Sequence, residues 1–171
     1  MNIFRLYSAD VPGTLYRVQY GDSMTTYDTH KGLEADDIDT LYDDGGDEQE
    51  EDNTLQRFGD AVKRHLNWDN DYRSIFISLF PQRRHAENWM LERHDRFGSR
   101  NCTLLQIDTR ALHGSFIFRV KEIVDALSLW IPEEAQASVA VEYLIAHYIP
   151  RRAIIRSQTV HDIRAGKTTP F

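Results

Sequence analysis

The sequence lacks the features that mark secreted and membrane proteins. Cys102 is the one cysteine among the 171 residues, so the chain has no internal disulfide, which fits a reducing compartment. No apolar run approaches the roughly 20 residues of a membrane-spanning helix, and the first residues show no secretory signal. We therefore expect a soluble cytoplasmic protein that has no membrane partner, either as this chain alone or as a domain of a larger one.

Basic residues are outnumbered by acidic ones. The chain has 20 Lys and Arg residues against 27 Asp and Glu residues, which gives a net charge of -7. A general nucleic-acid-binding protein would carry a basic surface, so the composition argues against that class. The length and the apolar fraction of 41% fit a single domain that folds around its own hydrophobic core.

Common cofactor and catalytic motifs are also missing. The sequence has no Gly-x-Gly-x-x-Gly and no Gly-x-Ser-x-Gly, and Gly166-Lys167-Thr168 lacks the earlier glycine of a phosphate-binding loop because His161 stands there. The seven histidines show no metal-ligand spacing with cysteine or carboxylate. We therefore expect neither a doubly wound dinucleotide fold nor a metal site, and we expect Cys102 to be a core thiol.

The residues present predict a mixture of helices and strands. Strands are expected at 14–20, 74–80, 102–108, 116–118, 139–150 and 153–160, and helices at 53–66, 82–97 and 120–131. The acidic stretch 28–53 is predicted to be a flexible loop, because like charges repel each other. A second loop is expected at Glu133-Glu134, and the tail at 164–171 is expected to fray.

Three polar residues, Arg17, Ser78 and Glu142, interrupt three of the predicted strands. A carboxylate is costly to bury unless it has partners or a role, so Glu142 is the most informative of them. Residues on three separate strands converge where those strands are neighbours. A carboxylate can stabilise the positive charge that develops on a sugar when a glycosidic bond breaks, and a guanidinium binds phosphate through its planar fork. The set therefore predicts a nucleotide site that breaks an N-glycosidic bond.

The order Arg, Ser, Glu on successive strands resembles the R-S-E class of ADP-ribosyltransferases, typified by cholera-toxin-like and pierisin-like enzymes. The matching segments are Leu15-Tyr16-Arg17, Phe76-Ile77-Ser78, and Val141-Glu142-Tyr143-Leu144 followed by Ile149-Pro150. The segments 74–80 and 86–89 also resemble an uncharacterised group of fungal domains. The resemblance implies that residues 1–171 form one α+β domain, in which two small, mostly antiparallel sheets form a central cleft with helices on the flanks.

The resemblance also implies an activity and a role for each site residue. The activity would be NAD-dependent mono-ADP-ribosyl transfer or NAD hydrolysis, with NAD as the substrate and no metal. Glu142 would be the catalytic carboxylate, Arg17 would bind the phosphates and the adenosine ribose, and Ser78 would support the ribose on the nicotinamide side. The backbone of Val18 would bind the nicotinamide amide, and Phe80 would stack on its ring.

Two departures from the family pattern keep alternatives open. Ala140 stands where arginine-modifying members carry Glu or Gln, so we expect another acceptor or water, and protein is favoured over nucleic acid as the acceptor. Leu79-Phe80 stands where the second motif of the family often continues with two hydroxyl residues. This departure favours a catalytically silent interaction module of the same fold. Transfer onto nucleic acid would need a local basic rim, for which the chain offers Arg83, Arg84, Arg93, Arg96, Arg151 and Arg152, although a solvated helix face explains the first four equally well.

Overall fold

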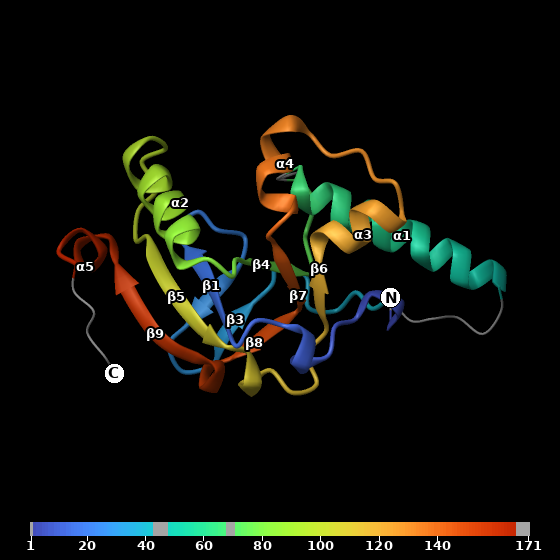
Figure 1. Cartoon of the computed structure of the whole chain (residues 1–171), viewed down its shortest axis with the longest axis horizontal. Helices are drawn as coiled ribbons and strands as arrows, with labels where there is room; N and C mark the ends of the chain where they lie inside the picture. Colours follow the sequence, from blue (N-terminus) through green and yellow to red (C-terminus); the bar gives the residue numbers. More distant parts are fainter. Residues whose placement is uncertain (1, 43–47, 68–70, 167–171) are drawn as a thin grey trace.

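The computed structural model describes residues 2–42, 48–67 and 71–166 (Figure 1). The strands are β1 (Thr14–Gln19), β2 (Thr26–Asp28), β3 (Gly32–Glu34), β4 (Phe76–Leu79), β5 (Thr103–Asp108), β6 (Ile117–Arg119), β7 (Tyr143–Ala146), β8 (Tyr148–Pro150) and β9 (Ile154–Thr159). The α-helices are α1 (Glu48–Leu66), α2 (Arg83–Asp95), α3 (Val120–Ala126), α4 (Glu133–Val139) and α5 (Val160–Arg164). Short 3-10 turns occur at Asn2–Phe4, Ser8–Asp10, Thr109–Ala111 and Arg151–Ala153.

The described strands form three antiparallel sheets of three strands each, with the orders β1-β5-β9, β2-β3-β8 and β4-β7-β6. The predicted α+β class with small antiparallel sheets is confirmed, although three sheets form where two were expected. Helix α2 covers the β1-β5-β9 sheet, while α1, α3 and α4 gather beside the β4-β7-β6 sheet (Figure 1). No helix in the described part of the chain is long and apolar enough to cross a membrane.

Two backbone pairings connect strands that are far apart in the sequence. Tyr16 of β1 and Phe80, the residue after β4, exchange both backbone hydrogen bonds, at 2.8 and 2.9 Å. In the neighbouring pair, Leu79 of β4 lies opposite Tyr143 of β7. These pairings bring the end of β4 between the middle of β1 and the start of β7, and they place the three strands of the predicted site side by side.

The core on the α1 side is aromatic. Phe58 of α1 is fully buried and packs against Phe76 of β4 and Phe118 of β6, with ring centroids 5.9 and 5.3 Å apart. Such clusters bury a large apolar area and add edge-to-face contacts. A separate core under α2 includes Ala86 and Met90. Both cores fix helices against the sheets on either side of the β1–β4 junction.

The prediction of one strand over 139–150 was wrong. Val139 ends α4, and the backbone carbonyl of Ser138 accepts from the amides of residues 141 and 142 at 2.9 and 2.8 Å, so Glu142 directly precedes β7 instead of lying inside a strand. His147 then adopts a left-handed φ of 64°, which separates β7 from β8. The two halves pair in different sheets, and this break explains the additional sheet.

The helix predicted for 120–131 ends early, and the loop predicted at 133–134 is the start of a helix. Helix α3 stops at Ala126, because Ser128 adopts a φ of 49°. Leu127 and Ile131 continue the apolar spacing of a helix in the sequence. In the structure both residues reach the α1 core from the connecting loop. Pro132 does not end a helix but is the N-cap residue of α4, with extended backbone angles.

The predicted loop at 28–53 is wrong at both ends. β3 lies within it, and α1 begins at Glu48 and not at residue 53. Gly32 makes β3 possible, because its φ is 126° and a Cβ there would overlap the carbonyl oxygen of Ile149 in β8. The part of the predicted loop at 43–47 and the predicted fraying of 167–171 lie outside the described residues.

Candidate functional site

The structure brings Arg17, Ser78 and Glu142 together, as the sequence predicts. The Nη1 of Arg17 donates to the backbone carbonyl of Ser78 at 3.3 Å. The carboxyl group of Glu142 is hydrogen-bonded by the Ser78 hydroxyl and lies within electrostatic range of the Arg17 guanidinium. Three residues separated by more than 60 positions from one to the next thus meet at the junction of β1, β4 and β7.

Glu142 is a buried carboxyl group, with 4% of its surface exposed. Burial raises its pKa above the usual value, while hydrogen bonds from the side chains of Ser78 and Ser138 and the charge of Arg17 oppose the shift. Ser138 reaches Glu142 from the last turn of α4, a helix that the sequence did not predict. The partners hold one carboxyl group in a fixed place inside a site of low polarity, as a charge-stabilising group requires.

Arg17 is held from three sides. Its Nη2 donates to Ser23 at 2.9 Å and to Thr25 at 3.1 Å, in the loop that follows β1. Its Nε is buried and has no hydrogen-bond partner in the described part of the chain. Burial lowers the pKa of Arg17, and the neighbouring Tyr20 and Glu142 oppose this; a guanidinium keeps its charge in proteins nevertheless. Arg17 is therefore a fixed cation whose buried Nε–H is left unused.

All five residues proposed for the site line one cavity of about 290 Å³. Val18 and Phe80 contribute apolar wall beside the three polar residues, and the Phe80 ring packs on His85 of α2 with centroids 4.7 Å apart. Residues that the sequence reasoning did not assign to the site complete the lining: Tyr20, His85, Trp89, Glu92, Ala137 and Ser138. The cavity, which we call the smaller cavity, lies between α2 and α4.

His65 is a second buried polar group that the sequence reasoning missed. It lies near the end of α1, where its two ring nitrogens are 2.7 Å from the Ser74 hydroxyl and 2.8 Å from the Ser78 hydroxyl. Burial, with a further contribution from the charge of Arg17, lowers the pKa of His65 to about 3, so the ring is neutral at pH 7. A neutral imidazole has one donor and one acceptor nitrogen, and it therefore fixes how both serine hydroxyls point.

A larger cavity of about 470 Å³ adjoins the smaller one and shares Arg17, Tyr20 and Ser78 with it. Its wall includes Arg64, His65 and Arg93. Only 15% of the Arg93 side chain is exposed, so a solvated helix face does not account for this residue. The guanidinium of Arg93 lies over the Tyr20 ring, 4.3 Å from the centroid, and Arg93 lines the larger cavity.

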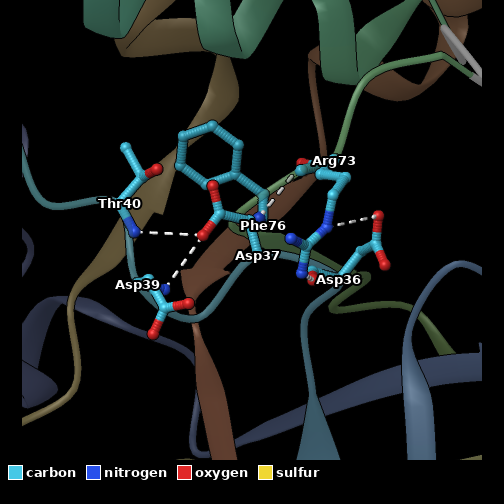
Figure 2. A network of polar contacts seen from close by, with 7 residues as sticks. Asp36, Asp37, Asp39, Thr40, Arg73 and Phe76 are labelled. Atoms are coloured by element: carbon cyan, nitrogen blue, oxygen red, sulfur yellow. Dashed lines mark hydrogen bonds and ion pairs between the residues drawn. The ribbon is translucent and has the colours of Figure 1, made fainter.

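Asp36, in the acidic segment after β3, lines the larger cavity. Figure 2 shows the polar contacts of this segment. The Asp37 carboxylate accepts from the backbone amides of Asp39 and Thr40 at 2.9 and 3.0 Å, which closes a tight turn. Arg73 pairs with Asp36 at 3.7 Å and also donates to its backbone carbonyl. These contacts hold Asp36 at the cavity wall. In the described residues no group of three or more His, Cys, Asp or Glu side chains is placed to hold a metal ion.

A sequence model of the family described as "Domain of unknown function (DUF7587)" matches residues 10–163. The chain belongs to this family. The matched region of the DUF7587 domain contains every residue that lines the two cavities. A search of curated proteins found no match.

Among solved structures the DUF7587 domain is similar to EcPltA, a toxin subunit that is an ADP-ribosyltransferase. The TM-score is 0.53 at 11% sequence identity, over 86% of this chain and 75% of that chain. At this identity the likeness shows the fold alone. The domain therefore has an ADP-ribosyltransferase-like fold, and its activity has to be argued from its own residues.

Proposed function

We propose that the domain binds NAD and cleaves its nicotinamide–ribose bond, as a mono-ADP-ribosyltransferase or an NAD glycohydrolase. The observation that carries the proposal is the convergence of Arg17, Ser78 and Glu142 in one cavity with Val18 and Phe80. The unused buried Nε of Arg17 suits an anionic ligand, because a buried donor without a partner is rare and costly.

In the proposed reaction the bond between ribose C1′ and the nicotinamide nitrogen breaks, and its electron pair leaves with nicotinamide. Glu142, in its ionised form, stabilises the positive charge that develops on the ribose. The oxygen of water or another nucleophile of an acceptor then bonds to C1′ and loses its proton. Ser78 keeps Glu142 in place, and His65 fixes the Ser78 hydroxyl from the other side.

For the acceptor we propose water or a protein side chain other than arginine. Ala140 is exposed and brings no polar group to the region before Glu142. Nucleic acid is disfavoured because several arginines of the suggested basic rim have internal partners. Arg83 pairs with Glu87 at 2.7 Å, Arg96 pairs with Glu92 at 3.0 Å, and Arg151 donates to the backbone. A cytoplasmic location is part of the proposal, since Cys102 is a free, buried thiol.

The test is nicotinamide release from NAD by the purified domain, followed by chromatography. We expect release by the wild type and a loss of about a hundredfold or more in Glu142→Gln, because a preorganised charge in a buried site contributes on that scale. Glu122→Gln is the matched control, since Glu122 lies on the exposed surface of α3. Release by Glu142→Gln at the wild-type rate would contradict the proposal. NAD binding without any release, in buffer or with cell extract as an acceptor source, would favour the silent interaction module.

A further inference from the structure

Arg93 is held in the larger cavity by rings and not by a strong ion pair. Its guanidinium lies 4.3 Å from the Tyr20 ring centroid and 5.1 Å from that of Phe97. Its one ion pair joins Nη2 to the Asp22 carboxylate at 3.2 Å, and its buried Nε has no partner in the described residues. A cation that is mostly covered but incompletely paired suits an incoming anion.

Arg17 alone has too few free donors for a ligand with two phosphate groups. Of its five N–H groups, one donates to the Ser78 carbonyl and two donate to Ser23 and Thr25. The remaining donors are Nε–H and one Nη1–H. Arg93 lines the same cavity from α2, and within the part of the chain that the structure describes only one of its side-chain N–H groups has a hydrogen-bond partner. Two guanidinium groups from separate elements therefore face one space of about 470 Å³, a size suited to a nucleotide.

The Asp22 carboxylate accepts a hydrogen bond from one N–H of Arg93. It lies in the loop that follows β1, and 64% of its side chain is exposed. An exposed ion pair contributes little to stability, so its partner is readily exchanged. A diphosphate brings more charge and more acceptor oxygens than a single carboxylate, and it can replace Asp22 on Arg93.

We propose that Arg93 is a second phosphate-binding residue, which holds the diphosphate of the dinucleotide together with Arg17, and that Asp22 competes with this ligand. The inference rests on the proposed function, because it names how the same site holds the ADP half of NAD. It places that half in the larger cavity and leaves the smaller cavity for nicotinamide and its ribose.

The test is calorimetric titration of the folded domain with ADP, which carries the diphosphate but has no nicotinamide bond to cleave. We expect Arg93→Gln to weaken ADP binding about tenfold or more, since hydrogen bonds to charged groups contribute on this scale. Arg84→Gln, an exposed position of the same helix, is the matched control and should bind ADP like the wild type. Adenosine, which has no phosphate, should bind equally to the wild type and Arg93→Gln.

The variant Asp22→Asn tests the same inference without changing Arg93. Removal of the competing carboxylate should tighten ADP binding severalfold, and the gain should vanish in the Asp22→Asn, Arg93→Gln double variant because it acts through Arg93. If Arg93→Gln fails to fold, Asp22→Asn decides, and unchanged ADP affinity overturns the inference. A folded Arg93→Gln with wild-type ADP affinity also overturns it, even if the wild type cleaves NAD. A domain that binds ADP through Arg93 but never releases nicotinamide would support the inference and refute the proposed activity.

Discussion

The two cavities share a wall but differ in what builds them. The smaller cavity combines apolar residues with one buried carboxyl group, and it lies between α2 and α4. The larger cavity carries three arginines, Arg17, Arg64 and Arg93, together with Asp22 and Asp36 on its wall. The smaller one suits a cationic ring and the positive charge that develops on the ribose, whereas the larger one suits an anion. A division of this kind is what the dinucleotide needs, because its negative charge is concentrated in the diphosphate.

His65 lines the larger cavity and is hydrogen-bonded to Ser78, which lines both cavities, so its replacement should have the largest effect. Its pKa of about 3 in the folded domain lies below the ordinary value of 6.5, so the unfolded chain binds a proton first as the pH falls. The stability from this group is complete above pH 6.5 and is lost toward pH 3. Linkage predicts a loss of about 3 kcal/mol in unfolding free energy between pH 7 and pH 4.

Urea unfolding at pH 7 and pH 4 measures this loss. The variant His65→Asn should lack most of the difference between the two pH values, while the exposed control His113→Asn should retain it. An equal pH dependence in the wild type and His65→Asn would show that His65 is not held as a neutral buried ring.

Arg17 lines both cavities, so its replacement should affect both halves of the ligand. Arg17→Lys keeps the charge but loses the planar fork, and it cannot bond Ser23, Thr25 and Ser78 in the same way. We expect the affinities for NAD and for ADP both to fall about tenfold by calorimetry. A loss confined to NAD would remove Arg17 from the phosphate side and break the division between the cavities.

Phe80 lines the smaller cavity and not the larger one, so its replacement should affect only the nicotinamide half of the ligand. Phe80→Leu removes a ring that packs on His85 and faces the cavity. We expect NAD affinity to fall about fivefold through the lost ring stacking, while ADP affinity stays at the wild-type value. Equal losses for NAD and ADP would mean that the smaller cavity does not hold the nicotinamide end.

The smallest expected effect is on stability at Glu142. Because burial raises its pKa in the folded state, ionisation opposes folding, and the stability present below the unfolded pKa is lost as the pH rises through the folded value. Glu142→Gln should therefore unfold at a temperature about 2–4 °C higher at pH 8, an increase of about 1 kcal/mol, typical when a functional group is neutralised. The difference from the wild type should shrink at pH 4, and a melting scan at both pH values measures it.

The sequence predicted where most strands lie and which residues meet at the smaller cavity. Arg17, Ser78 and Glu142 stood out because each interrupts an apolar segment, and the structure brings them together. The turn before β7 and the break at His147 were missed, because the mostly apolar residues on either side of them have the composition of one continuous strand. The apolar spacing through Leu127 and Ile131 was misleading, because both residues reach the core from a loop.

The larger cavity was missed, although the sequence contained a signal for it. His65 lies seven residues after the buried Phe58, and Arg93 lies seven after the buried Ala86, so helical spacing places both on buried faces. A polar residue on the buried face of a helix needs partners, so it indicates a candidate site in the same way as a buried carboxylate. Their partners Ser74 and Tyr20 come from other elements, which no local pattern reveals.

The central claim is that the two cavities form one NAD site, and a crystal structure of Glu142→Gln with NAD tests it most directly, because this variant should bind the dinucleotide without cleaving it. We predict that nicotinamide lies in the smaller cavity beside Phe80 and that the diphosphate lies between Arg17 and Arg93 in the larger one. NAD bound outside these cavities, or bound in the reverse orientation with its adenine beside Phe80, would contradict the account.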